Sequence, residues 1–259
     1  MRLFVTGFNS SLVKVIISNL SNIDIIPISS STNSESNKMK FDIGSLKNFN
    51  SEDYILHCAW NMKERNKEKS HQINVDGSIN FFNSLNLNQK KNFIFVSTIS
   101  AIPNTLSIYG KHKLKVEDYV LSNQGKVLRL GLLHDNNNND GLGFISDLRS
   151  VANYFPIIPN FSGNSKIYRI STKNEISKYF DSDLSKKSNN LYLAYTEKAY
   201  SFKELLNDIL GINKPVIRFP FRVGYLIIKL VRKVSPTYKL NDDSFLYIKS
   251  MKENIPHNE

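Results

Sequence analysis

The sequence has one cysteine and no long run of apolar residues. Cys58 alone cannot form a disulfide within the chain, which fits a reducing compartment. The longest apolar stretch, at 223–231, contains Lys229 and has about half of the roughly 18 residues that a membrane span needs. An apolar run at 2–6 follows the first methionine directly, so we expect no leader peptide. These absences predict a cytoplasmic protein.

Signatures of nucleic-acid binding and of metal binding are also missing. The net charge is +11, but the lysines are scattered, with no zinc-finger spacing, aromatic RNA-binding signature or basic arm. We therefore expect no nucleic-acid partner and no metal, and the charge suits a small anionic ligand. Only 218–239 is both basic and apolar, which makes it the one candidate for membrane contact. Packing of this segment on the core is the favoured interpretation.

Short apolar runs alternate with helical patterns through the first half of the chain. With 259 residues, 41% hydrophobic and 22% charged, the chain has a globular balance and can bury a large core. The alternation predicts βαβ units and a parallel sheet. Strands are expected at 2–6, 23–28, 53–60, 92–98, 126–133 and 190–195, helices at 10–20, 70–87, 107–122 and 201–211, and polar loops at 29–38 and 134–143.

The pattern changes after residue 131, where prolines and an asparagine run appear. We expect an α/β fold, with a Rossmann-like doubly wound parallel sheet and a small mixed C-terminal part. The nucleotide-binding core would span 1–131, including the helix at 107–122. The substrate-binding part would span 132–259 and return one late strand, 190–195, to the core.

The turn after the first strand keeps one of the three glycines that favour a dinucleotide phosphate group. Gly7 is present, whereas Ser10 and Val13 stand where two more glycines are expected. The hydroxyls of Ser10 and Ser11 can still hydrogen-bond a phosphate. The missing glycines count against conventional tight binding, so a catalytically silent protein of the same fold stays open.

The end of the second expected strand bears on the choice of cofactor. An acidic residue there would bind the ribose 2′-hydroxyl of NAD. This chain has Ser29, Ser30, Ser31 and Thr32 instead, and hydroxyls do not repel a 2′-phosphate. The sequence therefore favours NADP(H), with NAD(H) as the alternative.

Tyr109 and Lys113 are four residues apart in an expected helix, so they share one helix face. A nearby ammonium favours the phenolate and should lower the pKa of Tyr109. Such a phenol can exchange a proton with a carbonyl or hydroxyl oxygen. The pair follows an apolar strand ending at Ser97 and Thr98, and ligands of open α/β sheets bind at that edge.

Six motifs occur in the order and approximate spacing of a known family. They are VTGFNSSLV (5–13), FDIGSL (41–46), YILHCAW (54–60), INVDGSINFFNSL (73–85), NFIFVSTIS (92–100) and YGKHKLKVEDYV (109–120). Through them the sequence resembles the extended short-chain dehydrogenase/reductases, which include nucleotide-sugar epimerases, dehydratases and 4-ketoreductases. The resemblance is strong over 1–131 and looser beyond it.

The resemblance implies roles for individual residues. Tyr109 would be the catalytic acid/base, Lys113 would hold the nicotinamide ribose, and Thr98 would hydrogen-bond the reacting oxygen. Among cofactor contacts, Asp42 would meet adenine and Ala59 would line the groove. The full expected cofactor site is Gly7, Ser10, Ser11, Ser29, Asp42, Ala59, Asn74 and Lys113, with Asn74 supporting the active-site backbone.

The implied function is oxidoreduction of a nucleotide-activated sugar. We expect first a 4-ketoreductase of surface polysaccharide precursor synthesis, and second an NAD-dependent 4-epimerase. A homodimer through the helices at 70–87 and 107–122 would match the family. The candidates for binding the substrate diphosphate are Arg149, Lys166, Arg169 and Arg218.

Further features depart from the family or stay open. The connection from Thr98 to Tyr109 is shorter than in typical nucleotide-sugar members, and the chain is small. Trp60 either borders the nicotinamide or packs in the core. We expect a structural ion pair at Arg129 in preference to a substrate contact.

Overall fold

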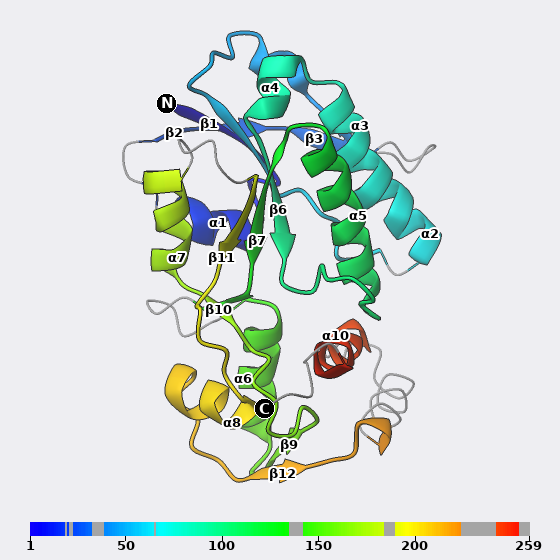
Figure 1. The fold of residues 1–259 in the computed structure, drawn as a ribbon, viewed down its shortest axis with the longest axis vertical. Coiled ribbons are helices and arrows are strands. Elements are labelled where there is room, and N and C mark those ends of the chain that lie inside the picture. The colour runs from blue at the N-terminus through cyan, green and yellow to red at the C-terminus, as the bar shows by residue number, and fades with distance from the viewer. Residues whose placement is uncertain are drawn as a thin grey trace.

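A parallel sheet with helices on both faces forms the centre of the computed structural model (Figure 1). The structure describes residues 1–18, 20, 23–32, 39–64, 66–134, 142–183, 190–223 and 242–253. The strand order is β11-β7-β6-β5-β1-β2, and every neighbouring pair is parallel. The strands are β1 (Arg2–Thr6), β2 (Asp24–Ile28), β5 (Tyr54–His57), β6 (Phe93–Thr98), β7 (Lys126–Leu130) and β11 (Leu191–Ala194). The expected Rossmann-like α/β class is confirmed.

Different helices bury the two faces of the sheet. In Figure 1, α1 (Ser11–Ile17) and α7 (Lys173–Lys178) lie on one side, and α3 (Gly77–Asn83) and α5 (Ile108–Ser122) on the other. Side chains of β6 alternate between the two faces. Ile94 and Val96 pack in the buried apolar cluster on the side of α1 and α7, and Phe93 and Phe95 pack in the cluster on the side of α3 and α5. Because both faces are covered, β6 is apolar at successive positions.

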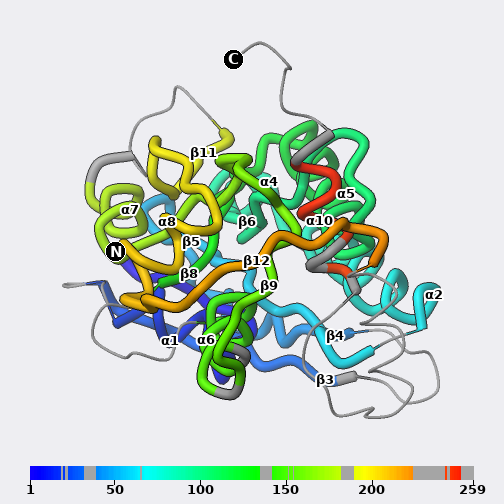
Figure 2. Tube along the Cα trace, turned by 90° about the horizontal axis from the view of Figure 1, so that it is seen from below, coloured from blue at the N-terminus to red at the C-terminus, as the bar shows by residue number. Residues whose placement is uncertain are grey.

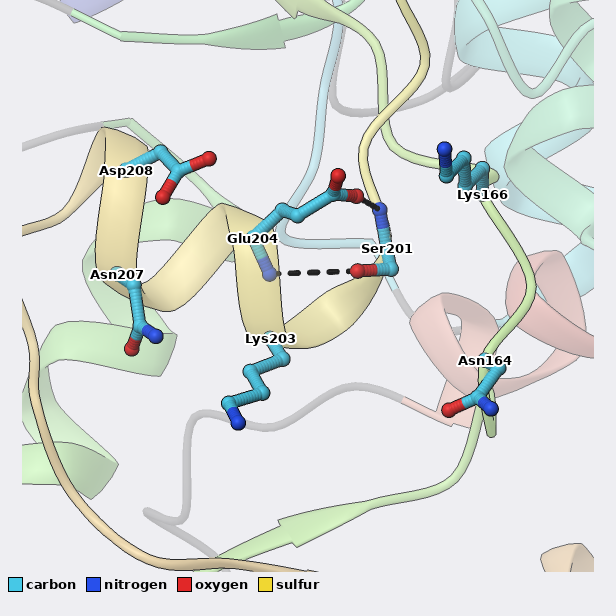
Figure 3. A pocket seen from close by; sticks show the side chains of 7 residues that line it. All are labelled: Asn164, Lys166, Ser201, Lys203, Glu204, Asn207 and Asp208. Atoms are coloured by element: carbon cyan, nitrogen blue, oxygen red, sulfur yellow. Dashed lines mark hydrogen bonds between the residues drawn. The ribbon is translucent and has the colours of Figure 1, made fainter.

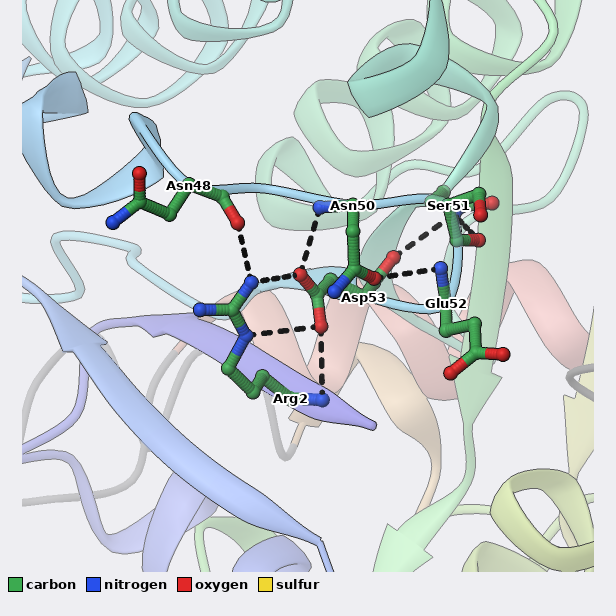
Figure 4. A network of polar contacts seen from close by, with 7 residues as sticks. Arg2, Asn48, Asn50, Ser51, Glu52 and Asp53 are labelled. Atoms are coloured by element: carbon green, nitrogen blue, oxygen red, sulfur yellow. Dashed lines mark hydrogen bonds and ion pairs between the residues drawn. The ribbon is translucent and has the colours of Figure 1, made fainter.

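An ion-pair network holds the first strand against the segment that precedes β5 (Figure 4). The buried Asp53 carboxylate accepts from the Arg2 guanidinium at 2.6 Å and from the amides of Arg2 and Asn50 at 3.1 and 2.8 Å. Burial alone would raise the pKa of Asp53, but these donors outweigh it and the pKa is lowered. The network fixes the starts of two neighbouring strands, β1 and β5.

The serine-rich segment after β2, predicted to be a loop, contains a strand. β3 (Ser30–Thr32) pairs antiparallel with β4 (Met39–Phe41), and 33–38 lies outside the described residues. In the usual doubly wound order, a third strand lies beside the second. Here β4 pairs with β3, so β2 is the last strand of the described sheet, with Pro27 exposed in it.

The helix predicted at 70–87 is wrong in its bounds. Helical structure begins at α2 (Lys67–Ser70), continues through a π-helical segment, η2 (His71–Asp76), and ends with α3. A separate helix, α4 (Leu87–Lys91), then starts, because the side chain of Asn86 accepts from the Gln89 amide and the Gln89 side chain accepts from the Asn86 amide. Such a capping box starts a new helix.

A further cluster of buried apolar residues belongs mainly to elements that lie below the sheet in Figure 1, and we call the region of these elements the second lobe. Figure 2 views it from below, with β9 and β12, a parallel pair, in front. Its elements are α6 (Phe144–Tyr154), β9 (Ile158–Asn160), α8 (Phe202–Glu204), η4 (Leu205–Ile209), β12 (Val216–Arg218) and α10 (Asp242–Glu253). The predicted domain division at residue 131 stays a prediction.

Short elements connect the sheet to this lobe. β8 (Leu132–Leu133) pairs parallel with β10 (Ile170–Ser171), and α7 with η3 (Tyr179–Asp183) then leads back towards β11. The predicted helix at 201–211 forms as α8 and η4. It starts with a capping box between Ser201 and Glu204 and ends before Gly211, whose φ is +64°.

Two predicted segments fall partly outside the described residues. The loop at 134–143 is undescribed over 135–141, and the basic apolar segment at 218–239 is undescribed from 224 on. Of the helices that the structure does describe, none has the length and apolarity to cross a membrane.

Candidate active site

The sheet reverses its strand order between β1 and β5, and ligands of open α/β sheets bind at such a point. Gly7 follows β1 with φ +69°, a conformation that side chains disfavour. A Cβ there would lie 2.9 Å from the Ala59 backbone. Gly7 therefore lets the ends of β1 and β5 approach closely.

Ser10 and Val13 occupy the positions of the second and third glycines of the usual dinucleotide-binding turn. Ser10 caps α1, its hydroxyl accepting from the Val13 amide at 3.3 Å, while Ser11 is exposed in the first turn. Val13 is fully buried against the sheet. The third glycine of the usual turn lets helix and strand pack closely, whereas Val13 fills that space.

A chain of buried hydrogen bonds fixes the floor of this edge. Thr6 Oγ1 accepts from the amides of Cys58 and Ala59, both at 3.1 Å. It therefore donates to His57 Nδ1 at 2.8 Å, and His57 Nε2 donates to Ser78 Oγ at 2.9 Å. Burial, with the charge of Lys113, lowers the pKa of His57 to about 3, so the ring is neutral. His57 is not among the residues that the sequence predicted for the site.

Close packing at Gly110 places Tyr109 beside the end of β6. A Cβ on Gly110 would lie 2.3 Å from the Ser100 carbonyl oxygen, so only glycine fits there. The Ser107 hydroxyl caps α5 by accepting from the Gly110 amide at 2.8 Å. The short 98–109 connection is thus accommodated by bringing the first turn of α5 directly onto the backbone after β6.

Lys113 is buried in a mostly aromatic environment on the same helix. Its Nζ donates to the Val96 carbonyl at 2.7 Å. The ammonium lies 4.0 Å from the ring centroid of Trp60, 4.5 Å from that of Phe95 and 5.8 Å from that of Tyr109. Trp60, which the sequence left open, contacts both residues of the pair, since its ring also meets Tyr109 edge-on at 5.9 Å.

The predicted lowering of the Tyr109 pKa is wrong. Burial and, after it, the charge of Asp243 raise the pKa of Tyr109 instead. Burial also lowers the pKa of Lys113 to about 7, against smaller opposing effects of Cys58 and Glu117. An ammonium that is partly deprotonated at neutral pH stabilises a phenolate less than a permanent charge would.

The other predicted catalytic residue, Thr98, ends β6. Its Oγ1 lies 3.1 Å from Ser100 Oγ and accepts from the Ser100 amide at 3.3 Å. The neighbouring Ser97 Oγ is buried without a hydrogen-bond partner among the described residues. The structure thus brings Thr98, Tyr109 and Lys113 to one edge of the sheet, and their catalytic roles stay predictions.

The predicted cofactor residues form two groups. Gly7, Ser10, Ser11 and Ala59 lie around the ends of β1 and β5. Ser29 and Asp42 are exposed and adjacent, because the Asp42 amide donates to the Ser29 carbonyl at 3.0 Å across the β3–β4 hairpin. Asp42 Oδ1 accepts from the Gly44 amide at 2.9 Å, at the start of the short helix η1 (Ile43–Leu46).

Asn74 is buried and braces the segment beside Trp60. Its Oδ1 accepts from the Asn61 amide at 2.6 Å and its Nδ2 donates to the Asn61 carbonyl at 3.1 Å. This contact fits the predicted support of the active-site backbone, which stays a prediction.

The residues present fit a nicotinamide dinucleotide in part. A side chain at position 7 would collide with the Ala59 backbone, so the turn needs a glycine, and the hydroxyls of Ser10 and Ser11 lie at the start of α1, where a phosphate is favoured. Val13 fills the space of the third glycine. No group of three metal-ligating side chains occurs in the described part of the chain.

The predicted diphosphate-binding residues have different surroundings, with Arg149 Nε buried and without a hydrogen-bond partner among the described residues, and their role stays a prediction. Arg169 donates to the carbonyls of Thr196 and Glu197, and Arg218 donates to Asn164. Lys166 lines an open hollow of about 430 Å³ in the second lobe (Figure 3). That hollow is bordered by Asn164, Lys166, Ser201, Lys203, Glu204, Asn207 and Asp208.

Arg129 forms the structural ion pair that the sequence predicted. Its Nε donates to Glu117 Oε1 at 3.1 Å, and its Nη2 to Glu117 Oε2. The pair is largely buried and ties α5 to β7, so Arg129 is not free to bind a substrate in this structure.

No protein-family model and no curated protein matches this sequence. Solved structures do. The dTDP-4-dehydrorhamnose reductase of Bacillus anthracis, in complex with NADP, is 17% identical, with a TM-score of 0.65 over 86% of this chain and 85% of that chain. The UDP-glucose 4-epimerase of Thermotoga maritima, with UDP-glucose, is 17% identical, with a TM-score of 0.57 over 85% and 86%.

A short-chain dehydrogenase/reductase superfamily protein of Agrobacterium tumefaciens, with bound NAD, is 12% identical, with a TM-score of 0.59 over 98% of this chain and 97% of that chain. Identities this low establish shared architecture and leave the chemistry of the site to be argued from its own residues. The chain has the fold of the short-chain dehydrogenase/reductases, as its motifs predicted.

Proposed function

We propose that this protein is an NAD(P)-dependent oxidoreductase that reduces the 4-keto group of a nucleotide-activated sugar. The observation that carries the proposal is that Thr98, Tyr109 and Lys113 lie at the sheet edge where the Gly7 turn follows β1. The structural neighbours named above include a sugar-nucleotide reductase bound to NADP, which supports this reaction class.

In this proposal, bound NADPH supplies the hydride to the carbonyl carbon of the sugar. The phenol of Tyr109 gives its proton to the carbonyl oxygen. Its raised pKa keeps it protonated at neutral pH, as a proton donor requires. Thr98 would hydrogen-bond the same oxygen, and the charged form of Lys113 would stabilise the phenolate that remains.

The hydroxyl-rich end of β2 supports NADP(H) as the cofactor. Ser29 is exposed beside Asp42, and no carboxylate stands in the first positions after β2. The exposed carboxylate of Asp42 lies across the hairpin and already accepts from the Gly44 amide. A 2′-phosphate would meet hydroxyls first, which can donate to it.

The first test is fluorescence titration with NADPH and NADH of the wild type and of Lys113→Ala. We expect tight NADPH binding that weakens at least tenfold in the variant. Lys111→Ala is the matched control, because Lys111 lies exposed on the same helix. It removes the same charge and should leave binding unchanged.

Each outcome separates the candidate functions. If the protein oxidises one NADPH for each nucleoside-diphosphate 4-keto sugar that it reduces, it is the reductase. Tightly held NAD, with sugar interconversion and no net NADH formation, would show a 4-epimerase. If neither nucleotide binds, Val13 and Ser10 have abolished the cofactor site, and the chain is a silent protein of this fold.

A further inference from the structure

A carboxylate from the second lobe binds the first turn of the helix that carries Tyr109. Both views place α10 beside the start of α5 (Figures 1 and 2). Asp243 Oδ1 accepts from the amides of Ile108 and Tyr109 at 2.6 and 3.4 Å. Asp243 Oδ2 accepts from the Ser107 hydroxyl at 2.5 Å. The pairing joins residues more than 130 positions apart.

The Asp243 carboxylate supplies a negative charge that the first turn of α5 lacks in its own sequence. The first turn of α5 contains no acidic residue, although its amides and its dipole favour a negative charge there. Ser107 already satisfies the Gly110 amide, so the Asp243 carboxylate completes the cap on the two amides that precede it. The second lobe thus provides half of the cap of the Tyr109 helix.

We propose that Asp243 is a positioning residue for Tyr109, which makes the placement of the proton donor depend on docking of α10. The inference rests on the proposed function and extends it from the sheet to the second lobe. Asp243 holds the backbone amide of Tyr109 itself, so any shift of α10 is passed directly to the residue that carries the phenol.

The charge of Asp243 acts in the same direction as its hydrogen bonds. Together with burial, it favours the neutral phenol of Tyr109, which is the form that donates a proton. The other charged or titratable groups near the phenol are Lys113 on α5 and Cys58 after β5, while His112 on α5 interacts with Asp243. Of these groups, Asp243 alone comes from the second lobe.

The neighbouring contact of Ser250 offers a matched control. Ser250, on the same helix α10, accepts from the Leu106 amide at 2.7 Å. Ser250→Ala removes a hydrogen bond between the same two segments without changing charge or touching α5. Asp243→Asn keeps an oxygen acceptor and removes the charge, and Asp243→Ala removes both.

The experiment measures kcat and KM with a 4-keto sugar nucleotide, and the Kd of NADPH, for the three variants. We expect kcat to fall at least tenfold in Asp243→Ala and less in Asp243→Asn. The Kd of NADPH should stay within twofold, because Asp243 binds only the first turn of α5, whereas Lys113 lies one turn further on and is held by the Val96 carbonyl. Ser250→Ala should keep wild-type kcat. An equal loss of kcat in Ser250→Ala and Asp243→Ala would show that only general docking matters and would overturn the proposal.

A second measurement needs no substrate. Trp60 is the single tryptophan and meets Tyr109 edge-on, so its emission reports on the first turn of α5. Emission should shift to the red in Asp243→Ala and not in Ser250→Ala. If this shift occurs while no sugar is turned over, the positioning contact stands and the proposed function fails. An unshifted emission in Asp243→Ala would refute the positioning role.

Discussion

Lys113 shows how one residue can serve a proposed reaction and yet destabilise the fold. Its ammonium is buried against Trp60 and Phe95 and donates to the Val96 carbonyl. Removing a charge from water costs free energy that such contacts recover only in part. The lowered pKa of Lys113, about 7, is the expression of that cost.

Replacing Lys113 by methionine should therefore stabilise the protein at neutral pH. The unfolded chain holds the Lys113 proton up to pH 10.5, whereas the folded chain releases it near pH 7. Between these values the unfolded state binds more protons, so wild-type stability rises with pH relative to Lys113→Met, by at most about 1.4 kcal/mol per pH unit. Below pH 7 the difference between the two proteins should be constant.

Urea unfolding midpoints at several pH values from 6 to 10 (about one unit apart) measure this difference. The comparison cancels all other titrating groups, which both proteins share. Lys111→Met should run parallel to the wild type, since Lys111 is exposed. Parallel curves for Lys113→Met as well would mean that the folded protein keeps its lysine charged throughout.

The Tyr109 pKa shows what the spacing of two residues in a helix can and cannot predict. The i and i+4 spacing correctly placed Tyr109 and Lys113 on one helix face. It could not reveal that both groups are buried, or that Asp243 lies nearby, since neither fact has a signature within the helix. The direction of the pKa shift was wrong for that reason.

At the scale of elements, the start of α5 depends on Gly110. Glycine is a poor helix former, so the close contact with Ser100, and not helix formation, requires it. Gly110→Ala should destabilise the protein by about 1–3 kcal/mol, because the added Cβ would lie 2.3 Å from a backbone oxygen. Helix propensity alone predicts the opposite sign, a gain of about 0.5–1 kcal/mol.

Gly77→Ala is the control for that prediction. It begins α3, and its Cβ would lie 3.3 Å from the Met39 Cβ, a much milder contact than the 2.3 Å at Gly110. Thermal or urea unfolding should place Gly77→Ala near or above the wild type. A similar loss of unfolding free energy in both variants would show that alanine at any helix start is destabilising here, and that the contact with Ser100 is not the cause.

Most elements of the sheet could be predicted because each has a local signature. Strands such as β6 are apolar at successive positions and alternate with helical patterns. The hairpin of β3 and β4 could not, since serines and threonine read as a loop and only pairing with Met39–Phe41 makes them a strand. The start of α4 did have a signal, the Asn86 and Gln89 capping box, which the apolar pattern obscured.

At the scale of the whole molecule, a net charge of +11 should draw an anionic cofactor towards the protein. We expect the association rate of NADPH to fall several-fold as salt rises from about 0.05 to about 0.5 M, because the field is screened. The dissociation rate should change little. Stopped-flow fluorescence measures both rates.

A neutral nicotinamide mononucleoside analogue provides the comparison, since its association should not respond to salt. If salt instead raises the dissociation rate of NADPH and leaves its association rate unchanged, short-range ion pairs hold the cofactor. The long-range field would then be irrelevant to binding.

Contacts between the sheet and the second lobe were the least predictable features. Asp243 caps a helix more than 130 residues away, and Ser250 accepts from the Leu106 amide over a similar separation. Such pairs have no periodicity or spacing to detect. The proposed active site was therefore predicted as a property of the first half, whereas its helix cap comes from the chain's last described helix.

The hairpin that replaces a third sheet strand has a consequence for the behaviour of the protein at high concentration. It leaves β2 as the last strand of the described sheet, with backbone groups that could pair with another molecule. Pro27, the fourth of the five residues of that strand, is exposed and lacks an amide hydrogen. The proline interrupts the row of donors that edge-to-edge association needs, so it acts as a built-in guard against aggregation.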